Sequence, residues 1–125
     1  MTQRLATGID MIEIHRFTTI APGIRDRFIR RVFSPAEQAE CANIDERLAG
    51  KFAAKEAVAK ALGSGVGQVG WQDIEITNDP SGQPQVSLKR TAAQIADSLH
   101  LTVWSISITH THDIAAAVAV AISTE

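Results

Sequence analysis

The sequence predicts an α+β fold, in which helices pack on a mainly antiparallel sheet. Runs of alternating apolar and polar residues come in pairs separated by short turns, which is typical of hairpins. The longest helical segments cluster in the first half of the chain, apart from these runs. With 125 residues, of which 45% are apolar, the chain suits one core. We therefore expect a single domain covering residues 1–125.

The first segments combine one strand with helices. Residues 5–14 alternate as a strand but carry apolar groups on both faces. A helix is expected over residues 24–32, after a Pro-Gly interruption. Ser34 and Glu37 then form the pattern of a capping box, with proline at the first helical position. This pattern predicts a helix that ends near Cys41.

The next helix is expected to run to Leu62, with Asn43 or Asp45 as its N-cap and Gly63 just past its end. Lys55 is unusual because, at about 100° per residue, it falls inside the apolar arc of this helix. That arc consists of Leu48, Phe52, Ala59 and Leu62. A lysine at this position must reach past its neighbours or meet an anion.

A hairpin is predicted next. Residues 71–77 and 85–88 have strand character, and the segment 78–82 between them is rich in turn-forming residues. A short amphipathic helix is expected over residues 91–99, with Ile95 and Leu99 facing inward.

The last two predicted strands, residues 102–110 and 114–122, form a second hairpin. One face of the final strand consists only of alanines, at positions 115, 117, 119 and 121. Because alanine allows close approach, we expect the Ala-rich helix of residues 47–62 to pack on this face.

Composition excludes several classes of protein. Twelve basic and fourteen acidic residues give a net charge of −2, so no global basic surface indicates nucleic-acid binding. The single cysteine, Cys41, excludes an internal disulfide framework and is compatible with the cytosol. The most apolar run, residues 114–122, is too short to span a bilayer, and no signal-peptide pattern is visible. We expect a cytoplasmic protein that does not bind membranes.

Charge is nevertheless concentrated locally. Residues 16–31 contain five arginines and one aspartate, and residues 47–60 contain four basic residues and one glutamate. Two basic segments on a mildly acidic chain indicate anionic partners bound at defined places.

Asp10 and Glu56 are the candidate metal ligands. Burial of a lone carboxylate in an apolar strand is costly, so Asp10 is paired, hydrogen-bonded, metal-bound or exposed at an edge. Together with Glu56 it could hold a hard divalent cation such as Mg²⁺, which takes one or two carboxylates. Glu56 and Lys60 could equally form an ordinary helical ion pair.

Two further patterns allow a functional and a structural interpretation. The loop Gly63-Ser64-Gly65 could offer amide groups to phosphate, but it lacks the Walker A lysine, and a helix C-cap explains Gly63 equally well. His110 and His112 could share a strand face and chelate zinc, although no third ligand stands at typical spacing.

With these residues described, the chain resembles the bacterial holo-[acyl-carrier-protein] synthases. Residues 8–16 are similar to that family's opening motif, G-x-D-(I/L)-(V/T)-E-(I/L)-x-R. Residues 52–65 are similar to F-A-A-K-E-A-x-x-K-A-x-G-T-G, with Ser64 in place of threonine. Residues 73–88 and 107–120 resemble the family's D-I-E-I hairpin and S-(I/L)-T-H-T ending. The motifs match in order and cover nearly the whole chain.

The resemblance implies a 4′-phosphopantetheinyl transferase. Such an enzyme moves the phosphopantetheine arm of coenzyme A to a serine of apo acyl carrier protein, or of a carrier domain of a fatty-acid synthase, and releases adenosine 3′,5′-bisphosphate. It also implies a role in fatty-acid biosynthesis and lipid metabolism, a requirement for Mg²⁺, and a homotrimer with active sites at the subunit interfaces.

The resemblance also implies roles for individual residues. Asp10 and Glu56 match the Mg²⁺ ligands, Glu56 is the candidate general base, and Lys60 matches the lysine that offsets charge on the leaving phosphate. Coenzyme A pocket positions are matched by Lys51, Lys55, Lys60, Ser64, Gly65, His110 and Thr111. The docking surface for the acidic carrier protein is matched by Arg16, Arg27 and Arg31.

The chain departs from the family pattern in two places that affect nucleotide binding. Ser105 stands where the family often has histidine, and Lys51 stands where many members have arginine. A rival hypothesis from another class is a non-catalytic module that binds an anionic nucleotide or an acidic partner through the same lysines. The rival does not require the carboxylate pair.

Overall fold

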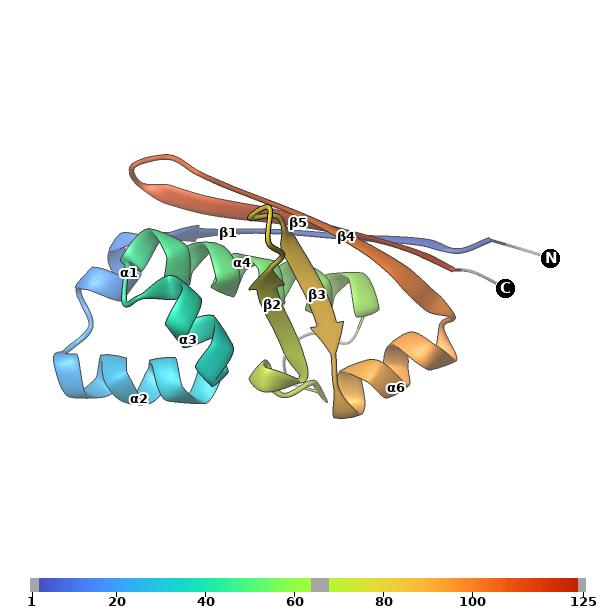
Figure 1. The fold of residues 1–125 in the computed structure, drawn as a ribbon, viewed down its shortest axis with the longest axis horizontal. Helices are drawn as coiled ribbons and strands as arrows, with labels where there is room; N and C mark the ends of the chain where they lie inside the picture. The colour runs from blue at the N-terminus through green and yellow to red at the C-terminus, as the bar shows by residue number, and fades with distance from the viewer. Residues whose placement is uncertain (1–2, 64–67, 124–125) are drawn as a thin grey trace.

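The computed structural model describes residues 3–63 and 68–123 of the chain. Its largest sheet has three antiparallel strands in the order β1-β5-β4 (Figure 1). The strands are β1 (Leu5–Glu13), β4 (Leu101–His110) and β5 (Ile114–Ser123). The structure confirms the predicted α+β fold and the hairpin between the last two strands.

Helix α4 (Asp45–Leu62) packs across one face of this sheet. The alanines of β5 at positions 115, 117, 119 and 121 are 0–3% exposed and lie on the buried face, as predicted. On β4, Trp104, Ile106 and Ile108 lie on that same side, whereas the alternating serine and threonine side chains are exposed. Small side chains on both elements thus allow a close contact between helix and sheet.

A second, two-stranded antiparallel sheet consists of β2 (Ile74–Asn78) and β3 (Pro84–Leu88). The hairpin is confirmed, but its first strand begins three residues later than predicted, because Trp71–Asp73 form a 3₁₀ turn, η1. The Asp73 carboxylate accepts a 3.1 Å hydrogen bond from the Gly70 amide, which closes this turn. A local side-chain contact therefore replaces the extended conformation.

Four shorter α-helices with bounds inside the described residues are α1 (His15–Thr18), α2 (Pro22–Val32), α3 (Pro35–Cys41) and α6 (Arg90–Ser98). The capping box of α3 is confirmed in both directions: the Glu37 amide donates to Ser34 Oγ at 3.2 Å, and the Ser34 amide donates to Glu37 Oε1 at 2.8 Å. Helix α1 was not predicted, and α2 begins earlier than predicted because Pro22 suits the first turn.

The N-cap predicted for α4 is wrong. Ile44 occupies the cap position, and its own side chain makes no capping hydrogen bond. Asn43 and Asp45 instead accept hydrogen bonds from Arg25 of α2, at 2.6 and 2.5 Å. A guanidinium from another helix therefore takes the oxygens that could have capped α4. At the other end, Gly63 has φ +80°, as expected for a left-handed C-terminal residue.

The sheet face opposite α4 is unusually apolar for an exposed surface. Leu5, Ile9 and Met11 of β1 are 67%, 63% and 62% exposed. They lie in register with apolar residues of β5, for example Ile9 beside Val118. Among residues 3–63 and 68–123, no helix combines the length and hydropathy needed to cross a membrane.

Candidate functional site

Helix α4 crosses the sheet obliquely, and two glycines mark where it crosses. A Cβ added at Gly50, in the second turn, would lie 3.0 Å from Ile108 on β4. A Cβ added at Gly8 on β1 would lie 1.8 Å from the Ala57 carbonyl oxygen. Because β5 lies between β4 and β1, the two ends of α4 reach opposite edges of the sheet.

Three charged side chains meet at the β1 edge. The Lys60 ammonium donates hydrogen bonds to the Ile9 carbonyl at 2.9 Å and to Asp10 Oδ1 at 3.2 Å. Asp10 lies opposite Ala117 of β5 and is partly buried. Glu56 stands one helical turn before Lys60 on α4. We refer to Asp10, Glu56 and Lys60 as the Asp10 cluster.

The electrostatics of Glu56 show that the two carboxylates of the Asp10 cluster interact. Burial raises the pKa of Glu56 above its ordinary value, the negative charge of Asp10 raises it further, and Lys60 lowers it. Two carboxylates that repel each other are a suitable pair for a shared divalent cation. Among the described residues, no group of three or more His, Cys, Asp or Glu side chains could hold a metal ion. A pair fits Mg²⁺, which completes its coordination with water and substrate phosphate.

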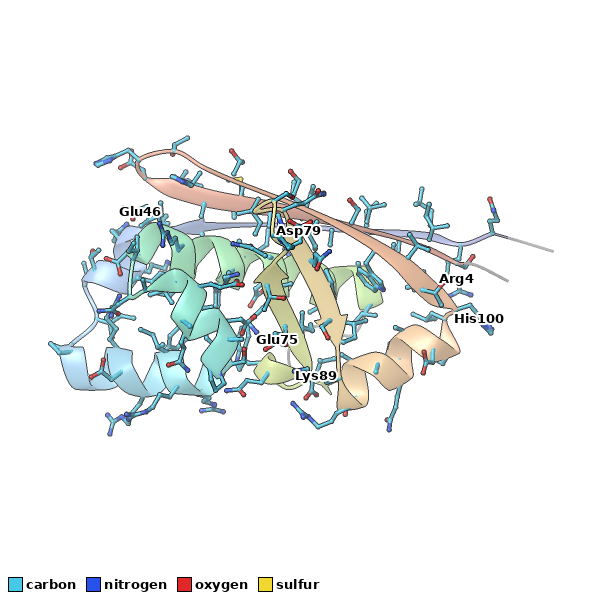
Figure 2. The ribbon with its side chains drawn as sticks, viewed as in Figure 1. Arg4, Glu46, Glu75, Asp79, Lys89 and His100 are labelled. Atoms are coloured by element: carbon cyan, nitrogen blue, oxygen red, sulfur yellow. The ribbon has the colours of Figure 1, made fainter. Side chains whose placement is uncertain are left out.

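A cavity of about 560 Å³ lies at the β4 edge, and we call it the β4-edge cavity. It is lined by the start of α4, the β2–β3 turn and the end of β4. Figure 2 labels Glu46 on α4 and Asp79 in the β2–β3 turn. An adjoining cavity of about 510 Å³ shares Glu46, Arg47 and His110 with it and also contacts Thr111 and His112.

The exposed side of α2 and the neighbouring α1 carry a group of arginines. Arg27, Arg30 and Arg31 are exposed there, and Arg16 is exposed on the neighbouring α1. The side-chain amide nitrogen of Gln72 donates hydrogen bonds to the carbonyl oxygens of Arg30 and Arg31, at 2.9 and 3.4 Å. These bonds fix the end of α2. Figure 1 shows that α2 lies on the far side of the molecule from the three-stranded sheet.

Comparison with known proteins agrees with this geometry. The family model of the 4′-phosphopantetheinyl transferase superfamily matches residues 6–119. The chain belongs to this superfamily. It is 47% identical over 118 residues to the holo-[acyl-carrier-protein] synthase of Moorella thermoacetica, covering 92% of this chain and 91% of the relative. It is also 47% identical over 118 residues to that of Alkaliphilus oremlandii, covering 92% and 96%.

Solved structures of the superfamily have the same fold. The Helicobacter pylori holo-[acyl-carrier-protein] synthase in complex with coenzyme A superposes with a TM-score of 0.83, at 32% identity, covering 92% of this chain and 98% of that one. The Bacillus anthracis synthase in complex with coenzyme A (3′,5′-ADP) has a TM-score of 0.78, at 29% identity, covering 98% and 100%. The fold of this chain is therefore the fold of these synthases.

Lys55 is paired inside the core. It is 1% exposed, and its ammonium lies 2.8 Å from Glu37 Oε1, 3.0 Å from the Trp71 carbonyl oxygen and 2.5 Å from that of Ile74. All three ammonium hydrogens are thereby used inside the core. The sequence correctly indicated that Lys55 must meet an anion. That anion is Glu37 of α3. The coenzyme A role expected for Lys55 stays a prediction.

Lys51 lines the β4-edge cavity, but its ammonium group is already paired with protein oxygens. Its ammonium lies 2.8 Å from Glu40 Oε1 and 2.7 Å from the Ile76 carbonyl oxygen, and the residue is 5% exposed. Glu40 also accepts from the Asn78 amide, with both oxygens at 3.1 Å. Lys51 therefore ties the start of the β2–β3 turn to α4 and shapes the cavity wall.

The other expected pocket residues fall into two groups. His110 lines both cavities, and Thr111 lines the adjoining one. Thr111 Oγ1 accepts from the amides of Asp113 and Ile114, so the β4–β5 turn is held in place. Within the described part of the chain, the zinc hypothesis for His110 and His112 gains no third ligand. Ser64 and Gly65 lie outside the described residues.

Sequence reasoning missed two residues of this region. Glu37 was interpreted only as a helix cap, yet it is 0% exposed and is the counter-ion of Lys55. Arg47 was counted only as part of a basic segment, yet it lines both cavities. The inward position of Lys55 in the sequence pattern indicated a buried carboxylate. It did not identify Glu37 as the residue that supplies that carboxylate.

Proposed function

We propose that this chain is a holo-[acyl-carrier-protein] synthase, a transferase that moves 4′-phosphopantetheine from coenzyme A to a serine of an apo acyl carrier protein or carrier domain. The observation that carries the proposal is the Asp10 cluster: two carboxylates and a lysine, from a strand and a helix far apart in sequence, meet at one sheet edge. The superfamily membership supports the same reaction.

Asp10 and Glu56 would hold Mg²⁺ through their carboxylate oxygens. When bound, Mg²⁺ supplies charge neutralisation and orientation of the diphosphate for in-line attack. Lys60 lies beside Asp10 and contributes a further positive charge at the same point. Its side chain is 53% exposed, so the ammonium can contact a phosphate oxygen without crossing the core.

The transfer replaces one phosphorus–oxygen bond by another. The serine oxygen attacks the phosphorus that carries pantetheine, and the bond from that phosphorus to the bridging oxygen breaks. Glu56 would accept the serine proton directly or through a water. Lys60 offsets charge on the departing adenosine 3′,5′-bisphosphate.

The active form would be a homotrimer with sites between subunits. The Asp10 cluster and the β4-edge cavity stand at opposite edges of the same sheet, so two neighbouring chains can combine one of each around a single coenzyme A. The exposed apolar residues of β1 and β5, including Ile9 and Val118, supply a surface that association would bury.

The carrier protein would dock on Arg16, Arg27 and Arg31. These arginines are exposed, and Arg16 forms only a long ion pair with the exposed Glu13, 3.7 Å between Nη2 and Oε1. An acidic helical partner fits such a surface through charge complementarity. We place the single domain of residues 1–125 in the cytoplasm and its reaction in fatty-acid biosynthesis.

Mass spectrometry of apo acyl carrier protein tests the transfer directly. Incubation with the chain, coenzyme A and Mg²⁺ should add the mass of phosphopantetheine. Asp10→Ala and Glu56→Ala should abolish the added mass while the circular-dichroism spectrum persists. Asp97→Ala removes an exposed carboxylate of α6, outside the site, and should retain transfer. Full turnover by both site variants would overturn the metal assignment.

Calorimetry separates this proposal from a non-catalytic binding module. A module that uses only its lysines would bind coenzyme A equally well with or without a chelator. The transferase should lose most of its affinity when the divalent cation is removed, because the carboxylates of Asp10 and Glu56 then repel the diphosphate.

A further inference from the structure

Three arginines share one face of α2. Arg27, Arg30 and Arg31 are spaced by three and four residues, so their side chains project from the same side of the helix. All three are exposed, and none of these guanidinium groups forms an ion pair within the described part of the chain. Arg27 and Arg31 belong to the docking surface proposed for the carrier protein, whereas Arg30 has no role assigned to it so far.

Gln72 of η1 joins the end of α2 to the start of α6. Its side-chain amide nitrogen donates to the Arg30 carbonyl oxygen at 2.9 Å, and its own carbonyl oxygen accepts from Arg90 Nη2 at 3.3 Å. Arg90 is the first residue of α6. Figure 1 shows α2 and the start of α6 on the same side of the molecule, away from β1 and β5. Arg30 and Arg90 therefore contact the same residue from two different helices.

Arg90 is held in an unusual conformation. Its φ is +49°, in the left-handed region that residues with a side chain disfavour. Its Nε donates to Asp73 Oδ1 at 2.7 Å, and this bond, with the one to Gln72, offsets the conformational cost. The Arg90 side chain is 65% exposed and that of Asp73 is 11% exposed, so the guanidinium covers the carboxylate. Among residues 3–63 and 68–123, Nη1 has no hydrogen-bond partner and can donate to an external carboxylate.

We refer to Arg30, Arg31 and Arg90 as the α2–α6 basic surface. Neither the β4-edge cavity nor the adjoining cavity is lined by these residues, so the surface is separate from the expected nucleotide pocket. It is continuous with the docking surface on α2, because Arg31 belongs to both. A partner that contacts both sides of Gln72 must carry carboxylates at more than one place, as an acidic protein surface does.

We propose that the α2–α6 basic surface binds a second acidic region of the carrier protein, so that the carrier contacts α6 as well as α2. This inference rests on the proposed function. Arg30 extends the row of α2 cations toward Gln72, and Arg90 continues it on α6. Gln72 holds the two helices in a fixed relation, which allows one rigid partner to meet both sets of cations.

The KM for apo acyl carrier protein tests the proposal. Arg30→Glu reverses the charge of an exposed side chain, and Arg90→Gln keeps a hydrogen-bond donor for Asp73. Each change should raise the KM for the carrier by about 2- to 5-fold, and the two effects should multiply in the double variant. The double variant should also flatten the salt dependence of this KM. The KM for coenzyme A should stay constant.

Arg4→Glu is the control for a general effect of charge, since Arg4 is exposed at the opposite end of the molecule from α2 (Figure 2). It should leave both KM values unchanged. Circular dichroism reports whether each variant folds, and Arg30→Glu alone decides the question if Arg90→Gln alters the spectrum.

An unchanged carrier KM in the folded variants would overturn the inference, while wild-type transfer would still support the proposed function. Binding of the wild-type chain to phosphatidylglycerol vesicles, together with that unchanged KM, would assign the surface to a membrane instead and would also overturn it. If the wild-type chain adds no phosphopantetheine to apo acyl carrier protein, the proposed function itself fails.

Discussion

The backbone of Gly8 on β1 lies against the carbonyl group of Ala57 on α4, so close that a Cβ at Gly8 would stand 1.8 Å from that oxygen. Asp10 follows Gly8 by two residues on the same face of the strand, and Glu56 precedes Ala57. The contact between strand and helix therefore sets the distance between the two proposed metal ligands.

Substitution of Gly8 by alanine should disrupt both stability and metal binding. Overpacking a tight contact costs about 1–3 kcal/mol, and backbone atoms give way less readily than a side chain. We expect Gly8→Ala to lower the unfolding midpoint in urea and to weaken Mg²⁺ binding measured by calorimetry. Gly23→Ala is the control, because a Cβ there meets no atom within 4 Å. Equal midpoints for the two variants would contradict the close contact.

The buried pair of Lys55 and Glu37 should control stability. Lys55→Met leaves the Glu37 carboxylate buried without its counter-ion, which should cost about 3–5 kcal/mol of unfolding free energy. In a double-mutant cycle with Glu37→Gln, the coupling energy should be about 0.5–3 kcal/mol. Lys60→Met is the matched control, since that side chain is 53% exposed, and should cost less than about 1 kcal/mol. Additive losses in the cycle would show that the pair is not coupled.

The pKa of Glu56 should move in opposite directions in two variants. Asp10→Asn removes a negative neighbour and should lower the pKa, whereas Lys60→Ala removes a positive one and should raise it. NMR titration of the Glu56 carboxyl carbon measures both shifts.

Because the folded-state pKa of Glu56 is raised, the folded state binds more protons than the unfolded state just above the ordinary pKa. Stability attributable to Glu56 is therefore present at low pH and lost as pH rises through the folded-state value.

Cys41 should be unreactive in the native protein. It is fully buried, and burial raises its pKa from 9.0 to about 11, so the thiolate fraction near neutral pH falls by about 100-fold. A thiol reagent should modify Cys41 at least about 100-fold more slowly in buffer than in denaturant. Rapid, complete modification without denaturant would show that the α3 region opens readily.

Arg27 and Arg31 together should govern association with the carrier protein. Replacing both by alanine should raise KM for the carrier by about 2- to 30-fold, from about 0.4–2 kcal/mol for two exposed ion pairs, and should flatten its salt dependence. The KM for coenzyme A should stay constant. Arg4→Ala removes an exposed arginine at the opposite end of the molecule from α2 (Figure 2) and should leave both KM values unchanged. An unaltered salt dependence in the double variant would reject this docking surface.

Local patterns predicted most elements of the fold. The capping box of Ser34 and Glu37, the left-handed Gly63 and the alanine face of β5 each depend on neighbours a few residues away, so their sequence signals were sufficient. The predictions of the α4 N-cap and of a strand beginning at Trp71 were wrong, because other contacts occupy the side chains concerned. Asn43 is taken by Arg25, and Asp73 closes a turn with Gly70, and neither competition is visible in propensities.

The sequence by itself determined the residue types of the site: an aspartate inside an apolar strand, and a lysine inside the apolar arc of a helix. Only the tertiary structure decided their partners. The oblique crossing of α4 brings Lys60 to Asp10 at one sheet edge and presents Arg47 at the other, while it turns Lys55 inward to Glu37. Partner choice depends on contacts between segments distant in sequence, and a periodicity of 3.6 residues fixes the direction of a side chain but not what lies there.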